Sequence, residues 1–121
     1  MEAVYVLNKQ KRNALLAYVD AITVEAGAKT AIITNVNIED YPFQYVTCRA
    51  DGTNRFSLEL GYTSSKVGPH GNPVDNTVLS DDDVIRADTE WVEAKGDRCN
   101  VWIHNKDTVA HTYDVRLYGV G

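Results

Sequence analysis

Residues 43–62, which read FQYVTCRADGTNRFSLELGY, decide the fold. In the second half of this stretch apolar side chains occupy every other position from Phe56 to Tyr62, the pattern of a β-strand with one face in a core. Residues 43–50 are rich in aromatic and β-branched side chains and read as a second strand. Between them lies Asp51-Gly52-Thr53-Asn54, and an Asp-Gly step readily adopts the positive φ angles of a tight turn. We therefore predict a hairpin that turns at residues 51–54.

The same alternation occurs on both sides of this stretch. Residues 99–103 and 113–117 flank the turn residues 105–108 and predict a second hairpin. A strand, turn and strand are predicted around residues 25–28. The two strands beside residues 25–28 cover residues 21–24 and 30–38. Further strand residues are 84–88 and 90–92, and the latter lead into a turn at 95–97. About seven or eight short strands separated by turn signals indicate an all-β sandwich or barrel.

Three segments do not follow the strand pattern. Residues 63–77 are rich in Gly, Pro, Ser and Asn, which predicts a long exposed loop. Asp81-Asp82-Asp83 is interpreted as a solvated loop that precedes the strand at Val84, because it lacks the ligand spacing of an EF-hand. Residues 8–18 fit either a short helix or an extended arm that runs into a strand at 15–24, since short apolar runs do not separate the two.

Composition and charge limit the class of protein. The chain has 121 residues, 44% apolar and 24% charged, which suits one folded domain. Its net charge of -5 argues against a nucleic-acid partner. No apolar run is long enough to span a bilayer and the start has no basic region of a secretory signal, so we expect no membrane association and synthesis in the cytoplasm. Cys48 and Cys99 are accordingly expected to be reduced thiols in the core.

A catalytic or metal site is not visible in the sequence. His104 and His111 bracket the predicted turn near Asp107, and such a group could bind a metal, but no third ligand has a recognisable spacing. No phosphate-binding loop, nucleophile elbow or Cys-x-x-Cys motif occurs. We therefore expect a protein that is not an enzyme and has no catalytic residue, no metal site and no cofactor.

The aromatic residues indicate binding instead. By alternation Trp102 lies on the same strand face as Asn100 and His104, away from the apolar positions, and Tyr118 lies likewise on the last strand. A Trp among polar neighbours fits an interface anchor, a platform for stacking a sugar, or a strand that is covered on both faces. We take Trp102, His104 and Tyr118 as candidate interface or ligand-binding residues.

Several turns and strands resemble those of a known group of proteins. The segments Ile22-Thr-Val-Glu-Ala-Gly27-Ala-Lys-Thr, residues 49–60 and residues 92–105 followed by 112–119 are similar to small jelly-roll β-sandwich proteins of tailed-bacteriophage particles, of the capsid decoration or cement type. The resemblance covers roughly residues 21–120. Lys95-Gly96-Asp97 departs from the usual Ala-Gly-Asp turn by an inserted Lys, and the basic segment before Asp20 has no fixed counterpart.

The resemblance implies an antiparallel, jelly-roll-like β-sandwich over residues 21–121, and the residues before it predict an N-terminal arm or short helix over residues 1–20. The resemblance further implies a virion structural protein, made in the host cytoplasm, that stabilises the particle by binding between capsid subunits. The expected partners are the chain itself, as a trimer or another homo-oligomer, and the major capsid protein. The arm residues expected to bind a partner are Lys9, Lys11, Arg12 and Leu15. The alternative is a carbohydrate-binding or receptor-binding β-sandwich module.

Overall fold

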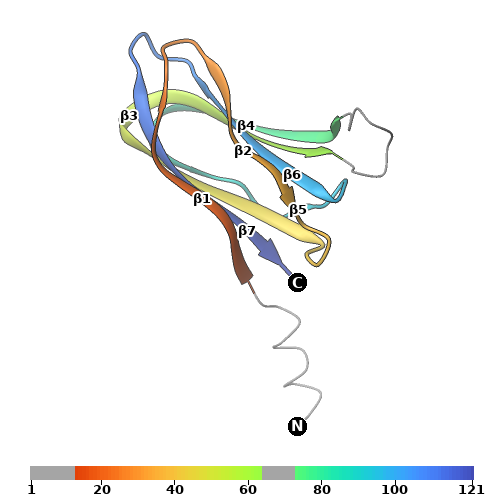
Figure 1. Cartoon of the computed structure of the whole chain (residues 1–121). Coiled ribbons are helices and arrows are strands. Elements are labelled where there is room, and N and C mark those ends of the chain that lie inside the picture. The colour runs from red at the N-terminus through yellow and green to blue at the C-terminus, as the bar shows by residue number, and fades with distance from the viewer. Residues whose placement is uncertain (1–12, 64–72) are drawn as a thin grey trace.

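The protein is built from antiparallel strands. The structure, a computed structural model, describes residues 13–63 and 73–121, with the backbone only for residues 73–83 (Figure 1). Its strands are β1 (Asn13–Val24), β2 (Lys29–Asn37), β3 (Phe43–Thr63), β4 (Pro73–Asp88), β5 (Val92–Glu93), β6 (Arg98–Asn105) and β7 (His111–Val120). The described residues include no helix, and so none that is long and apolar enough to cross a membrane.

The long strand β3 organises the sheet. Its first part, Phe43 to Ala50, pairs with β7, and its second part, Phe56 to Thr63, pairs with β6. The register between β3 and β4 shifts between Arg49 and Asn54, where β3 changes partners. Residues 51–54 therefore lie inside one continuous strand, and the predicted hairpin at this position is wrong. Gly52 does not adopt a positive φ, so the Asp-Gly step is used for a bend within the strand and not for a tight turn.

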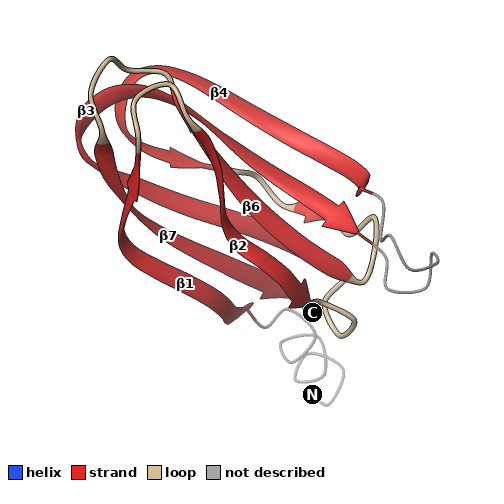
Figure 2. Cartoon of the chain, turned by 45° about the horizontal axis from the view of Figure 1, so that its top comes forward, coloured by secondary structure: helices blue, strands red, loops and turns tan. Residues whose placement is uncertain are grey.

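The bend divides one curled sheet into two facing parts. We call β1, β7, residues 43–50 of β3 and β5 the first half-sheet, and β2, β6 and residues 54–63 of β3 the second half-sheet. Strand β4 pairs with β3 in both parts, and the two long strands arch together from one half-sheet to the other (Figure 2). The all-β, antiparallel, jelly-roll-like sandwich that we predicted is thereby confirmed.

The second predicted hairpin, and the predicted strand, turn and strand around residues 25–28, each connect the two half-sheets instead of forming a pair. β6 and β7 follow each other in the chain, but β6 pairs with β2 and β3, whereas β7 pairs with β1 and β3. β1 and β2 are likewise in different half-sheets, joined by a turn in which Ala28 N donates to Glu25 O and Gly27 has a φ of 74°. The strands and turns of these two segments were predicted correctly, and the pairing of residues 99–103 with 113–117 was wrong.

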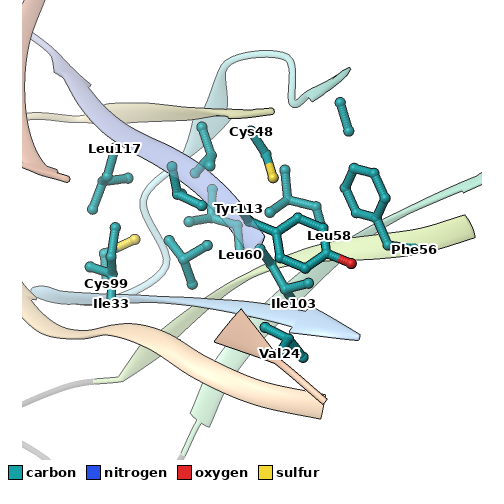
Figure 3. Close-up of a cluster of buried hydrophobic side chains, with 14 of the residues drawn as sticks. Val24, Ile33, Cys48, Phe56, Leu58, Leu60, Cys99, Ile103, Tyr113 and Leu117 are labelled. Atoms are coloured by element: carbon teal, nitrogen blue, oxygen red, sulfur yellow. The ribbon is translucent and has the colours of Figure 1, made fainter. Parts of the chain in front are cut away.

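The core lies between the two half-sheets. Alternate residues of β3, β6 and β7 point into it, from Cys48 and Leu117 in the first half-sheet to Leu58 and Ile103 in the second (Figure 3). Burying these apolar side chains supplies the main driving force for folding, at about 25 cal/mol per Å². Both cysteines are thiols and both are buried, as expected, with Cys48 contributed by the first half-sheet and Cys99 by the second.

Hydrogen bonds between buried side chains also hold β3 in its bent form. The Tyr62 hydroxyl donates to Gln44 Oε1 over 2.6 Å, although the two residues are 18 positions apart on the same strand. Near the bend, the Tyr113 hydroxyl donates to Asn54 Oδ1 over 3.3 Å. Because a buried polar group without a partner is costly, these bonds favour the bent strand over a straight one.

The two outermost strands of the sheet path, β1 and β2, each carry a bulge. Ala21 in β1 has a φ of 52°, and its N–H donates to Asp114 Oδ1 over 2.7 Å. Asn35 in β2 has a φ of 58°, and its N–H donates to Asn100 Oδ1 over 2.7 Å. In both places the bulge removes an N–H from the ladder, and a side chain of the neighbouring strand accepts its hydrogen bond.

Strands are longer than the sequence indicated at three places. Pro73 to Thr77, expected in the long loop, and Asp81 to Asp83, expected in a solvated loop, belong to β4, because the backbone continues its pairing with β3 through both. Residues 64–72 lie outside the described residues. At the N-terminus β1 begins at Asn13, so residues 13–20, which we assigned to the arm, pair with β7. Residues 13–18, which fitted either a short helix or an arm that runs into a strand, are therefore strand and not helix, and residues 1–12 lie outside the described part.

Candidate functional site

The sequence-predicted site residues fall on two separate surfaces. Leu15 and Tyr118 are cross-strand partners on the outer face of the first half-sheet. Trp102 and His104 lie on the outer face of the second half-sheet. The two half-sheets present these residues on different sides, so the four residues do not form one interface. Lys9, Lys11 and Arg12 lie outside the described residues.

The outer face of the first half-sheet carries a group of aromatic side chains. Leu15, Tyr118 and Tyr45 are in direct register across β1, β7 and β3. The rings of Tyr45 and Tyr118 stack with centroids 4.7 Å apart, a favourable offset for aromatic pairs. Phe43 lies two residues before Tyr45 on the same side of β3, and its ring is 6.2 Å from that of Trp91. With Tyr18, these residues are called the aromatic face: Leu15, Tyr18, Phe43, Tyr45, Trp91 and Tyr118.

Much of the aromatic face is exposed. Tyr18 is 61% exposed, Trp91 56% and Leu15 50%. Charges border it on one side, where the Arg116 guanidinium lies 5.0 Å from the Tyr18 ring centroid and 2.7 Å from Asp20 Oδ1. The Asp20 hydrogen bond raises the pKa of Arg116, so this residue stays charged. An apolar centre with a charged rim is the composition of a protein interface.

A hollow lies on the outer face of the second half-sheet. The register places Ala31 of β2, Trp102 of β6 and Glu59 of β3 side by side, and Gly61 beside Asn100 in the adjacent row. Because Ala31 and Gly61 have little or no side chain, the half-buried Trp102 ring is not covered from these positions. The resulting space of about 310 Å³ is lined by Lys29, Glu59, Gly61, Tyr62, Thr63, Asn100 and Trp102.

An ion pair is part of this hollow. Lys29 Nζ lies 2.8 Å from Glu59 Oε2 and 5.5 Å from the centroid of the Trp102 ring. The Glu59 side chain is only 11% exposed, whereas that of Lys29 is 47% exposed. The carboxylate is therefore held at the base of the hollow and the ammonium at its rim, next to the ring.

His104 and His111 do not come together as a metal site. His104 is half-buried on the outer face of the second half-sheet, where Lys29 and Ser57 are its cross-strand neighbours. His111 starts β7 and contacts Asp51 and Asp107 through its two ring nitrogens. Among residues 13–63 and 84–121, whose side chains the structure describes, no group of three or more His, Cys, Asp or Glu has a geometry that could hold a metal ion.

Sequence reasoning missed Tyr45, Glu59 and Lys29. Glu59 and Tyr45 both occupy outward positions of an alternating strand, which the sequence does show. Their relevance depends on the neighbours that the bend in β3 provides: Tyr118 for Tyr45 and Trp102 for Glu59. The predicted hairpin between residues 43–50 and 55–62 gave both residues the wrong cross-strand partner.

Comparison with known proteins identifies neighbours by fold. No family model matches the chain, and no curated protein matches its sequence. A structure of the infectious bursal disease virus Gt strain matches with a TM-score of 0.58 and 9% identity, over 90% of this chain and 31% of that one. The infectious bursal disease virus VP2 subviral particle matches at 0.57 and 8% identity, over 90% of this chain and 32% of that one. The apo form of BiXyn10A CBM1, a carbohydrate-binding module, matches with a TM-score of 0.51 and 9% identity, over 90% of this chain and 96% of that one.

These neighbours are jelly-roll or β-sandwich proteins, among them viral capsid proteins and a binding module. The chain spans about a third of the length of the viral chains it matches. At these identities the likeness is one of fold, and a fold hosts many functions.

Proposed function

We propose that the chain is a virion structural protein of the capsid decoration type, which attaches to neighbouring subunits through the aromatic face. The exposure of this face carries the proposal. Six large apolar or aromatic side chains occupy one side of the first half-sheet, and three of them are at least half exposed. Contiguous exposed apolar patches of this kind mark interaction surfaces in folded proteins.

The chemistry of the aromatic face suits a permanent contact with protein. Tyr and Trp side chains are enriched at the centre of interfaces, where each can bury about 150–250 Å². A stable interface needs roughly 800 Å² from each partner, so the aromatic face would fill much of one. At about 25 cal/mol per Å², its burial outweighs single exposed ion pairs, which contribute on the order of 0.2–1 kcal/mol each.

The arm would act on the same partner. Asn13, the first residue of β1, donates through Nδ2 to the Tyr45 hydroxyl over 3.4 Å, so the chain enters the domain beside the aromatic face. Lys9, Lys11 and Arg12 immediately precede it, while residues 30–121 carry a net charge of -6. A basic segment next to an apolar surface would select a neighbour with an acidic rim, which a second copy of this acidic chain provides.

Analytical ultracentrifugation of the purified chain tests the use of the aromatic face. We expect the wild type to form a closed oligomer, such as a trimer, at micromolar concentration. A Tyr45→Ser, Tyr118→Ser double variant should be mostly monomeric, and Trp102→Ala, on the other half-sheet, should behave like the wild type. A wild type that stays monomeric, or a double variant that associates equally well, would refute this use of the face.

Location in a virion needs a second experiment. Particles from the source cells are separated on a density gradient and probed with an antibody against the chain. We expect the chain to co-sediment with genome-containing capsids and the double variant to be lost from them. A chain found only in the non-particulate fractions would refute the decoration role, whatever its oligomeric state.

A further inference from the structure

We propose that the hollow around Trp102 binds a neutral saccharide. This site lies on the second half-sheet, apart from the aromatic face, so it is independent of the proposed assembly role. Trp102 offers the side of its ring next to Gly61 and Ala31, where the strands carry almost no side-chain volume. The C–H face of a sugar ring stacks on such an aromatic surface, because both are flat and apolar.

Polar groups at the edge of the ring supply both hydrogen-bond acceptors and donors. Glu59 accepts from the Lys29 ammonium over 2.8 Å, which fixes its carboxylate in the hollow. Asn100 Oδ1 accepts from the Asn35 N–H over 2.7 Å, which fixes the side-chain amide and leaves its NH₂ group as a donor for a ligand. Sugar hydroxyls both donate and accept, so they can use the carboxylate and the amide together. Side chains already held in place lose little entropy on binding.

The charges in the hollow favour a neutral ligand. The Lys29 ammonium is paired with the Glu59 carboxylate, so the lining side chains carry no net charge. A phosphate or carboxylate ligand would be brought against the buried carboxylate of Glu59, which disfavours it. A purely apolar ligand would cover the ion pair without offering hydrogen bonds in return, which is also unfavourable.

The size of the hollow sets the length of the ligand. Its volume of about 310 Å³ is at the lower end of ligand sites and suits one or two sugar rings. It is open on one side, so a longer chain could continue over the surface beyond the stacked ring. We therefore expect weak binding of a single ring and tighter binding of short oligomers.

The chain contains two tryptophans, which allows a specific readout. In a Trp91→Phe variant Trp102 provides the only indole N–H signal in a ¹H–¹⁵N spectrum. We would titrate this variant with glucose, galactose, mannose and N-acetylglucosamine, and with β-1,4-linked glucose and N-acetylglucosamine tetramers, up to about 20 mM, a range that detects millimolar affinity. We expect a saturable shift of the Trp102 signal with at least one sugar, and a lower dissociation constant for its oligomer.

Two variants separate a saccharide site from a nonspecific shift. In the same background Glu59→Gln, which keeps the shape and removes the charge, should weaken binding at least tenfold while the spectrum remains that of a folded chain. Tyr118→Ser, on the aromatic face, should bind the sugar as well as the parent does. No saturable shift with any sugar, or equal binding by Glu59→Gln, would overturn the proposal. Neither result depends on whether the chain assembles.

A pull-down on insoluble cellulose and chitin shows the source of the saccharide. If the Trp91→Phe chain is retained and the Trp91→Phe, Trp102→Ala double variant is not, the ligand is a polysaccharide at a surface. Shifts with soluble oligomers but no retention would support a free oligosaccharide. Retention that does not depend on Trp102, combined with no shift in solution, would overturn the proposal.

Discussion

His111 Nδ1 lies 2.7 Å from Asp51 Oδ1, and this contact joins the first residue of β7 to the bend in β3. The other ring nitrogen of His111, Nε2, lies 2.8 Å from Asp107 Oδ2 in the loop between β6 and β7. A neutral imidazole has only one N–H, so only the protonated ring can donate to both carboxylates. The arrangement therefore holds the bend, the loop and β7 together when His111 is charged.

The stability of the protein should depend on this contact in a defined pH range. Hydrogen bonds first to Asp51 and then to Asp107 raise the pKa of His111 above its ordinary 6.5. The Thr112 N–H and then His111 lower the pKa of Asp51 below its ordinary 3.8, and His111 does the same for Asp107. The contribution of this contact to stability is therefore fully present between about pH 3.8 and pH 6.5. It is lost as pH rises through the raised pKa of His111, or falls through the lowered pKa values of the two carboxyls.

Urea unfolding of the wild type and a His111→Gln variant at about pH 5.5 and about pH 9 measures the effect. The wild type should exceed the variant in unfolding free energy at the lower pH, and the difference should shrink at the higher pH. His104→Gln, on the second half-sheet, serves as the matched control. The same difference at both pH values would show that His111 contributes by shape and not by charge.

Gly96 should not tolerate a side chain. A Cβ built at this position collides with the carbonyl oxygen of Thr63 at the end of β3. Gly96→Ala should therefore destabilise the protein by about 1–3 kcal/mol, the usual cost of overpacking, in a denaturant titration. Gly52→Ala is the control, because nothing lies within 4 Å of its Cβ and its φ is not positive. Equal free energies of unfolding for the two variants would contradict the close approach of Gly96 to Thr63.

The bulge at Ala21 predicts a stabilising substitution. A φ of 52° costs an alanine about 1–2 kcal/mol, whereas glycine adopts it freely but loses about 0.5–1 kcal/mol in entropy. Ala21→Gly should therefore raise the free energy of unfolding by about 0.5–1 kcal/mol. Ala17→Gly, in the same strand at an ordinary φ, should lower it by a similar amount. A loss of stability in both variants would contradict the left-handed conformation at residue 21.

The cysteines should be unreactive in the folded protein. Burial raises the pKa of the Cys99 thiol to about 12, so almost no thiolate is present at neutral pH. Ellman's reagent at about pH 8 should react slowly with the native chain and rapidly with two thiols in concentrated guanidinium chloride. Finding no thiols in the denatured chain would show that Cys48 and Cys99 had formed a disulfide.

The core strands other than β4 could be predicted from the sequence because they depend on local alternation. The positions of Cys99, Val101 and Ile103 in β6 and of Tyr113, Val115 and Leu117 in β7 alternate in the sequence as they do in the core. Pairing could not be predicted, because it depends on whether the Asp51-Gly52 step reverses the chain or only bends it. The residues of that step allow both, and the outcome depends on distant contacts such as His111 with Asp51 and Tyr62 with Gln44.

The candidate site was predictable to the same extent. Alternation placed Trp102, His104 and Tyr118 outward, and the structure keeps all three outside the core. Alternation could not show that Tyr118 stacks on Tyr45 or that Trp102 adjoins Glu59. The residues of these two pairs are 73 and 43 positions apart in the sequence. A search for outward aromatic residues on every predicted strand would have found Tyr45 but not Lys29.

The bulges in β1 and in β2 have a consequence for the behaviour of the protein at high concentration. Each of these strands pairs on one side only within the described sheet, and an open strand edge is a template for fibre growth. The kinks at Ala21 and Asn35 turn backbone N–H groups inward to Asp114 and Asn100, so a straight incoming strand finds an interrupted ladder. Interrupted edges of this kind oppose amyloid-like stacking at both ends of the β1-β7-β3-β6-β2 path.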